Sequence, residues 1–373
     1  MTDSTSFSPI WASPPGDTIA DILEERGWNQ AEFARRTGFT RKHINDLVQG
    51  RMPITPDAAE RLHHVLGSTT EFWLMREAQF QAAKVRQAAR AALAKDAGWL
   101  TEVPVAWIQK RGWIPSARSK PDHVHSLLGW FGVASVPAWR ETFTKPLTAF
   151  RSSTRIAKVD GAVATWLRAA EIAAASIACQ PFSLDAFRAA LPILRSLTTE
   201  ADLDVVIHEV QAICASAGVA VVFVEAPPGC PVHGATRWLT PTKALLALSF
   251  RYRSDDQLWF SLFHEAAHLL KHGKKLLFIE GYDGLDEAKE GEANRFAADL
   301  LIASSALARL RACRSAAQFV ALAAELGVAP GILVGRAQHE GWIARSHLNG
   351  LKVFYGPTPD GATSRALRDS ANA

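Results

Sequence analysis

Two histidines and a glutamate in the C-terminal half of the chain have the spacing of a zinc-hydrolase motif. Residues 263–270 read FHEAAHLL, so His264, Glu265 and His268 form an H-E-x-x-H pattern inside an apolar run without glycine or proline, where a helix is expected. Residues four apart share one face of a helix, so both imidazoles can bind the same ion. Glu265 lies about 100° further round the helix and reaches the water on the ion rather than the ion itself. The pattern predicts zinc-dependent hydrolysis with Glu265 as the catalytic base.

The surrounding residues predict a well-defined helix. Residues 254–257 read SDDQ, which is a capping-box pattern that would start the helix just upstream of the motif. Apolar side chains then form a stripe that can pack on a core, and they are Trp259, Leu262, Phe263 and Leu269. The competing interpretation is a buried helix whose histidines are ordinary core or surface residues.

A catalytic zinc takes three protein ligands and keeps a fourth position for water, so a third ligand is required. The next helical segment, residues 286–301, offers carboxylates in its first turns. The apolar residues that define its predicted buried face are Ala293, Phe296, Ala297, Leu300 and Leu301. Glu292 borders that face, whereas Glu287 and Glu290 point more towards solvent. We therefore expect Glu292 to be the third ligand and keep Glu290 as the reserve.

The two motifs together resemble the ImmA/IrrE family of metallopeptidases. The H-E-x-x-H pattern is followed at residues 290–301 by EGEANRFAADLL, and the likeness covers roughly residues 205–355. It implies a gluzincin-like zinc site with His264, His268 and Glu292 as ligands and Glu265 as the base. It also implies a protein substrate, typically a repressor. The family often ends this motif with proline, where this chain has Ala303 and Ser304, a departure that affects no catalytic residue.

Length and composition limit the class of protein. A chain of 373 residues predicts two or three domains, and 48% hydrophobic with 21% charged residues is ordinary for a globular protein. The net charge of +4 permits a nucleic-acid partner without requiring one. The four cysteines lack C-x-x-C spacing, which argues against a disulfide framework or a thiolate zinc site. The start lacks a secretory signal, and the most apolar stretch is interrupted by charges, so we expect a cytoplasmic protein without a membrane partner.

Residues 14–90 predict a separate helical domain that binds DNA. Four amphipathic runs, each with a glycine at or just beyond its end, cover residues 17–26, 30–37, 41–49 and 56–66. Asn29 and Thr40 can cap the second and third helices. The short connection at residues 38–40 matches a helix-turn-helix, whose second helix enters the major groove.

The expected DNA contacts lie at the start of this recognition helix. Thr40, Arg41, Lys42 and Asn45 would face the base edges, and Gln30 would lie near a phosphate. The competing interpretation is a small helical bundle used for protein contacts. Against it, residues 35–51 contain five Lys/Arg and one acidic residue, Asp46, so positive charge is concentrated where DNA would lie.

The pattern of this segment resembles the XRE-type helix-turn-helix of the HigA antidote group. The matching residues run from 15–17 (PGD) through 50–56 (GRMPITP) to 71–74 (EFWL). The resemblance implies that Gln30, Thr40, Arg41, Lys42 and Asn45 contact a palindromic double-stranded operator as a homodimer. HigA-like antidotes often pair with a ribonuclease toxin, so a cognate toxin is a second possible partner.

The rest of the chain completes a mostly α protein with a small β-sheet, an α+β fold. We expect a helical connector over 91–200, whose tryptophans pack in a core, and a zincin-like domain over 201–355. Strands are predicted at 218–225, 235–239 and 244–251, and residues 356–373 predict a disordered tail. Arg237, Arg251, Tyr252 and Tyr282 are weaker candidates for stabilising an oxyanion.

Two functions follow from these patterns. The first is a DNA-binding transcriptional regulator with a zinc-dependent endopeptidase that cleaves a protein, either a repressor or itself. The second is a HigA-like antitoxin or repressor in which the zinc domain is a non-catalytic sensor or scaffold.

Overall fold

The computed structural model describes residues 13–148, 157–249, 251, 253–273, 277–280, 287–357 and 363–366. Its contacts divide the chain into two compact units, Met1–Gly98 with Ala117–His125, and Trp99–Ser116 with Ser126–Ala373. Each unit has its own hydrophobic core. The fold is mostly helical with a small sheet, as the sequence predicts.

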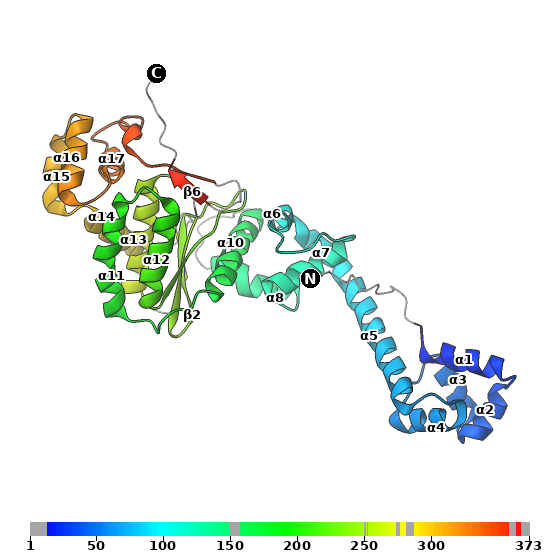
Figure 1. Ribbon diagram of the computed structural model, residues 1–373. Helices are drawn as coiled ribbons and strands as arrows, with labels where there is room; N and C mark the ends of the chain where they lie inside the picture. The colour runs from blue at the N-terminus through cyan, green and yellow to red at the C-terminus, as the bar shows by residue number, and fades with distance from the viewer. Residues whose placement is uncertain are drawn as a thin grey trace. The chain divides into compact units, whose positions relative to one another are not determined.

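The first unit contains the expected four short helices and a long fifth one (Figure 1). Their bounds are α1 (Pro15–Glu25), α2 (Gln30–Thr37), α3 (Arg41–Val48), α4 (Pro56–Leu66) and α5 (Thr70–Lys95). Helices α1 to α4 and the start of α5 enclose one core, in which Ile19, Phe33, Ile44 and Trp73 are fully buried. Because these side chains recur at helical spacing, the apolar pattern was sufficient to predict this bundle.

The turn between α2 and α3 has the predicted local chemistry. The Asn29 side chain accepts a hydrogen bond from the Glu32 backbone N–H at 2.9 Å, and Thr40 accepts one from the His43 N–H at 3.1 Å. Each bond satisfies a free N–H at a helix start. Gly38, which ends α2, has φ of 70°, a left-handed conformation that glycine adopts at no steric cost. The helix-turn-helix predicted for 30–48 is therefore present.

The second unit begins with helices built around tryptophan. They are α6 (Val105–Lys110), α7 (Lys120–Phe131, whose last residues belong here), α8 (Val136–Trp139), α9 (Lys145–Thr148) and α10 (Ala157–Ala175). Trp99 packs edge-on against Trp139 at 5.2 Å between ring centroids, and both are buried. Trp166 is also buried, and its indole N–H donates to the Val224 carbonyl at 2.7 Å. These tryptophans are packing residues, as expected, although Trp113 is 39% exposed.

A four-stranded mixed sheet lies at the centre of the second unit. Its order is β1 (Val219–Phe223), β3 (Lys243–Leu248), β2 (Gly234–Thr240) and β4 (Phe278–Ile279). β1 runs parallel to β3, whereas β2 is antiparallel to both β3 and β4. The three predicted strands are confirmed. The two-residue β4 was not predicted, because so short a strand has no detectable alternation.

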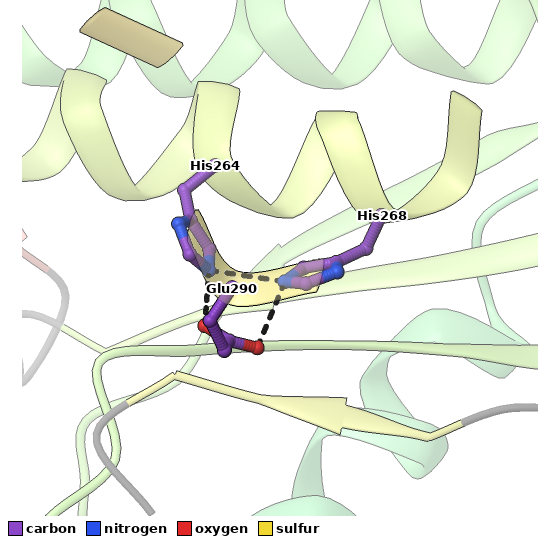
Figure 2. A group of neighbouring side chains, drawn as sticks. All are labelled: His264, His268 and Glu290. Atoms are coloured by element: carbon purple, nitrogen blue, oxygen red, sulfur yellow. Dashed lines mark hydrogen bonds and ion pairs between the residues drawn. The ribbon is translucent and has the colours of Figure 1, made fainter. Parts of the chain in front are cut away.

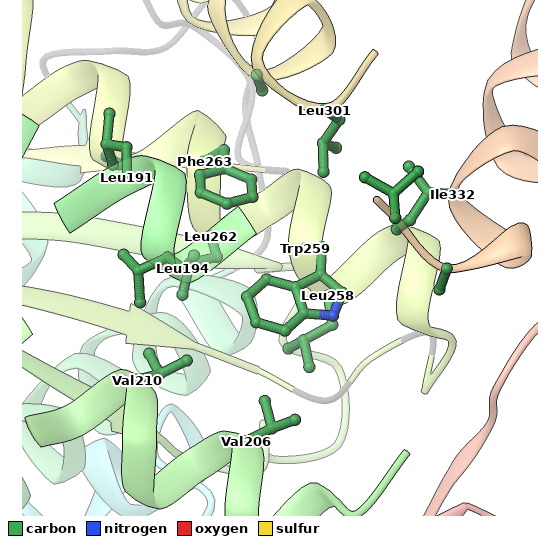
Figure 3. Close-up of a cluster of buried hydrophobic side chains, with 14 of the residues drawn as sticks. Leu191, Leu194, Val206, Val210, Leu258, Trp259, Leu262, Phe263, Leu301 and Ile332 are labelled. Carbon is green, nitrogen blue, oxygen red and sulfur yellow. The ribbon is translucent and has the colours of Figure 1, made fainter. Parts of the chain in front are cut away.

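Helices cover both faces of this sheet (Figure 1). Alternate side chains of β1 point to opposite faces, so Val219 and Val221 join one core and Ala220 and Val222 the other. α10 packs on the second face. The first face carries α11 (Leu184–Ser196), α12 (Leu203–Ser216) and α13 (Asp255–Lys271), whose apolar side chains are shown in Figure 3. Helices α10 and α11, which we assigned to the connector over 91–200, thus pack onto the sheet of the following region.

The C-terminal part adds α14 (Glu287–Leu301), α15 (Leu307–Ala312), α16 (Ala316–Leu326) and α17 (Pro330–His339). A two-stranded sheet of β5 (Tyr355–Pro357) and β6 (Thr363–Ala366) follows, so part of the predicted disordered tail is strand. Residues 358–362 and 367–373 lie outside the described residues. In the part of the chain that the structure describes, no single helix could cross a membrane by length and hydropathy, although α16 and α17, bent by 113°, pass that test as a pair.

Candidate metal centre and nucleic-acid interface

Helix α13 presents the motif from the interior of the second unit. Both histidines are 1% exposed and Glu265 is fully buried. Trp259, Leu262 and Phe263 anchor the helix in the core (Figure 3). The predicted capping box at its start is wrong, because the Ser254 side chain makes no cap hydrogen bond. Instead the Asp255 carboxylate accepts the Asp256 backbone N–H at 2.8 Å.

Three side chains converge at one point between α13 and α14 (Figure 2). The Nε2 atoms of His264 and His268 are 3.0 Å apart. The Glu290 carboxylate faces both, with Oε2 at 3.1 Å from His264 Nε2 and Oε1 at 3.3 Å from His268 Nε2. The three ligand atoms lie within 4.8 Å of one another. Two imidazoles and one carboxylate are a donor set that suits zinc.

The structure corrects the expected third ligand. Glu292 lies outside the cluster, and its carboxylate instead contacts Lys271 Nζ at 2.8 Å and His272 Nε2 at 3.1 Å. Its side chain is 43% exposed, against 23% for Glu290. Glu290, kept in reserve from the sequence, occupies the position assigned to Glu292.

Helical phase explains the difference. Two residues along a helix rotate the side chain by about 200°, so Glu290 and Glu292 point in nearly opposite directions. The buried side chains of α14 are Ala293, Ala297 and Leu301, and Glu290 precedes the first two by three and seven residues. Phe296 and Leu300 are only partly buried. Including them widened the predicted buried face towards Glu292, whereas the narrower alanine stripe would have selected Glu290.

A second layer of polar residues holds the two imidazoles. Asn294 Oδ1 lies 2.9 Å from His264 Nδ1, which can donate to it. His268 Nδ1 lies 2.9 Å from His272 Nδ1, and Glu292 contacts the far nitrogen of His272. Phe278 of β4 also stacks on the His268 ring at 4.0 Å. If Nε2 of His268 is the ligand atom, its Nδ1–H donates to His272, and His272 Nε2–H donates to Glu292. This row of hydrogen bonds could have been suspected from the sequence, because His272 follows His268 by four residues, the spacing of one helix face.

Glu265 occupies an unusual environment for a carboxylate. Neither of its oxygens makes a well-aligned hydrogen bond within the described part of the chain, although the Thr236 hydroxyl lies near enough to lower its pKa. Burial raises its pKa well above the usual range, the charge of His264 lowers it, and Glu280 and Glu290 raise it further. Gly234 makes room for this side chain, because a Cβ at that position would lie 2.8 Å from Glu265 Oε1. Such an orphaned acid beside a histidine cluster fits a group that takes up and returns a proton.

The cluster is strongly coupled electrostatically. Burial alone would lower the pKa of His264, but Glu290, Glu265 and Glu280 raise it to about 9. Burial lowers the pKa of His268, against the opposing effect of Glu290. Burial opposes the ionisation of Glu290, yet the hydrogen bonds from both histidines bring its pKa down to about 2. A cation at this point would therefore meet an ionised carboxylate and would displace the proton of His264.

The weaker oxyanion candidates are engaged elsewhere or lie outside the described residues. Arg237 forms an ion pair with Glu171. Arg251 donates to the Cys230 carbonyl at 2.8 Å. Tyr252 and Tyr282 are outside the described residues.

The expected DNA contacts are exposed residues at the starts of α2 and α3. Gln30, Thr40, Arg41, Lys42 and Asn45 are all exposed, while Ile44 and Leu47 of the same helix are buried. The local positive charge is smaller than the sequence implied. Its remaining arginines are paired: Arg35 and Arg36 contact Glu32, and Arg51 contacts Asp46 at 3.0 Å.

Comparison with known proteins assigns a family to each of these two regions. Residues 19–74 match the Helix-turn-helix family, and residues 231–337 match the IrrE N-terminal-like domain, a peptidase family. An uncharacterized HTH-type transcriptional regulator, YddM, of Escherichia coli (strain K12) is 35% identical over 60 residues, which are 16% of this chain and 64% of that protein. This chain therefore matches slightly less than two thirds of that relative's length.

A solved structure also resembles part of the chain. It is described as an antidote protein of a plasmid maintenance system from Nostoc punctiforme PCC 73102. It shows 30% identity, covers 22% of this chain and 92% of its own, and has a TM-score of 0.22.

Proposed function

We propose that this chain is a DNA-binding transcriptional regulator carrying a zinc-dependent endopeptidase. The premise is that it combines an XRE-type helix-turn-helix domain with an IrrE/ImmA-like domain. Its substrate is a protein, either a repressor or a second copy of this chain. We expect it to act in the cytoplasm, where its DNA operator would be. An XRE-type module favours a homodimer on a palindromic operator.

The convergence of His264, His268 and Glu290 beside an orphaned Glu265 carries the enzymatic part of this proposal. Histidines that only filled a core would not direct both Nε2 atoms at one carboxylate, with both rings held from behind by further polar groups. A buried carboxyl without hydrogen bonds costs stability. Such a cost is typical of a functional site.

The residues have separate tasks in peptide hydrolysis. A zinc ion held by His264, His268 and Glu290 would supply an acidified water at neutral pH. Glu265 takes the proton of the attacking water and later returns it to the leaving amine. Asn294 fixes the orientation of His264, and His272 with Glu292 fixes that of His268. The surrounding core excludes bulk water, so the proton on Glu265 stays within the site.

The DNA-binding part rests on the exposed start of α3. Arg41 and Lys42 have no ion pair among the residues that the structure describes, so both are available for phosphates or base edges. Thr40 and Asn45 lie beside them, and Gln30 is exposed at the start of α2. Contacts from such side chains to the DNA phosphates fix the register of a helix-turn-helix on its operator.

A single substitution separates the two activities. We expect the full chain with Glu265→Gln to keep its zinc and its operator affinity but to lose peptide cleavage, measured as new N-termini in a proteome-derived peptide library and in the chain itself. Equal cleavage by wild type and variant would contradict the proposal. Absence of cleavage by both, with zinc bound, would favour a HigA-like antitoxin or repressor whose metal domain is a sensor or scaffold.

A further inference from the structure

A cavity of about 820 Å³ borders the candidate metal centre. Its walls come from α13, α14, α17 and the segment 349–354, together with His233 and Glu280 next to β2 and β4. Three lining residues also contact the centre or act on it. Asn294 bonds to His264, Phe260 lies one turn before His264 on α13, and Glu280 raises the pKa of both His264 and Glu265. The cavity therefore lies beside the site, although the cluster residues themselves do not line it.

The chemistry of the lining is mixed in a defined way. Its apolar part consists of Phe260, Leu301, Ile302, Ile332 and Phe354. Three of the lining residues also carry a buried polar atom without a hydrogen-bond partner among the described residues: Asp256 Oδ1, Glu280 Oε2 and Arg336 Nε. Two of these are acceptors and one is a donor. The lining therefore combines an apolar surface with charged side chains of both signs.

The charge balance argues against an anionic ligand. The lining contains four Lys/Arg and four Asp/Glu residues. Lys352 is paired with Asp256 at 2.7 Å and Arg336 with Glu340 at 2.9 Å. A phosphate site would need an excess of unpaired cations, which this lining does not have. A peptide supplies neutral donors, neutral acceptors and apolar side chains together.

We propose that this cavity binds the substrate on one side of the scissile bond and selects a bulky apolar side chain, a proposal that rests on the peptidase function above. The nine residues from Asp256 to His264 rise about 12 Å along the helix, which matches three to four residues of extended peptide. A leucine, isoleucine, methionine or phenylalanine side chain packs on Phe260 and Ile332.

The test compares cleavage specificity in two matched variants of the zinc-loaded full chain. Ile332→Trp fills the cavity, whereas Val320→Trp adds the same bulk on the exposed side of α16. With a proteome-derived peptide library, wild type and Val320→Trp should enrich large apolar residues at one position within four residues of the cut. Ile332→Trp should lose that enrichment and raise KM for an enriched peptide tenfold or more, with zinc content unchanged.

A second variant keeps the proposal testable if Ile332→Trp fails to fold. Ile332→Ala enlarges the cavity and should shift the preferred residue towards phenylalanine and tryptophan. Cleavage without any apolar preference, or with the same preference in both Ile332 variants, would overturn the cavity proposal while leaving the peptidase intact.

A binding measurement separates failure of the cavity proposal from failure of the peptidase proposal. In the Glu265→Gln background, library peptides retained by the chain are identified with and without Ile332→Trp. Retention of apolar peptides that depends on Ile332 supports the cavity proposal even if wild type cleaves nothing. Retention that does not depend on Ile332 contradicts it.

Discussion

Exchanging each of two neighbouring glutamates for glutamine should have very different effects on zinc affinity. Glu290 offers its carboxylate to both histidines, whereas Glu292 acts only through His272. We expect Glu290→Gln to abolish tight binding and Glu292→Gln to weaken it modestly. The sequence pattern alone led to the opposite ranking, so this pair separates the two interpretations.

The magnitudes follow from the contacts. Structural zinc sites are worth about 10–16 kcal/mol over four ligands, so one lost ligand costs about 3–4 kcal/mol, on the order of 100- to 1,000-fold in Kd. Loss of a group that orients a ligand typically costs 10- to 100-fold. Glu292 belongs at the low end, about tenfold, because its side chain is 43% exposed and water can replace part of its interaction with His272.

The assay is competition with a chromophoric zinc chelator, using the full chain at constant pH and ionic strength. Glu287→Gln is the control, because Glu287 is exposed on the same helix and outside the cluster, and it should leave Kd unchanged. A second comparison, His272→Ala alone and with Glu292→Gln, should show that the Glu292 effect disappears once His272 is absent. A loss for Glu292→Gln as large as that for Glu290→Gln would refute the assignment of roles.

Three further predictions address other parts of the molecule. Gly331→Ala should lower the free energy of unfolding by about 1–3 kcal/mol, because a Cβ there would clash with the Asp255 carboxylate; denaturant titration checks this against Gly350→Ala, where the space is open. Asp255→Asn should stabilise the metal-free chain at about pH 8 but hardly at about pH 4. Burial and the charge of Asp256 raise the Asp255 pKa to about 7. The native state therefore loses up to about 4 kcal/mol of stability as the pH rises from about 4 to about 7. Equal denaturant midpoints for wild type and Asp255→Asn at about pH 8, with EDTA present, would contradict this. Lys42→Ala should weaken operator binding and reduce the slope of log K against log salt by about 1, because a lost phosphate contact retains one counterion; anisotropy titrations at several salt concentrations that give an unchanged slope would place Lys42 away from the phosphates.

Local patterns predicted the elements of both domains well. The helices of the helix-turn-helix have glycine ends and capping side chains within a few residues, so Asn29 and Thr40 could be identified from sequence. The H-E-x-x-H spacing placed His264 and His268 on one face for the same reason, since both belong to one helix. Information of this kind is contained within a turn or two of chain.

Relations between distant segments were harder to predict. The choice between Glu290 and Glu292 depended on which side of α14 meets α13, and the partly buried Phe296 and Leu300 misdirected it. The packing of α10 and α11 onto the sheet was missed because their sequences show only helices, not the strands they cover. The role of Gly234 could not be inferred either, because the Glu265 side chain that needs its space is 31 residues away in sequence.

The most direct test of the metal centre is anomalous diffraction at the zinc edge from crystals of the zinc-loaded full chain. We predict one peak per chain, about 2.0–2.2 Å from Nε2 of His264, Nε2 of His268 and one oxygen of Glu290, with Glu292 still bound to His272. A peak coordinated by Glu292, or zinc located away from His264 and His268, would contradict the proposed site and with it the hydrolytic function.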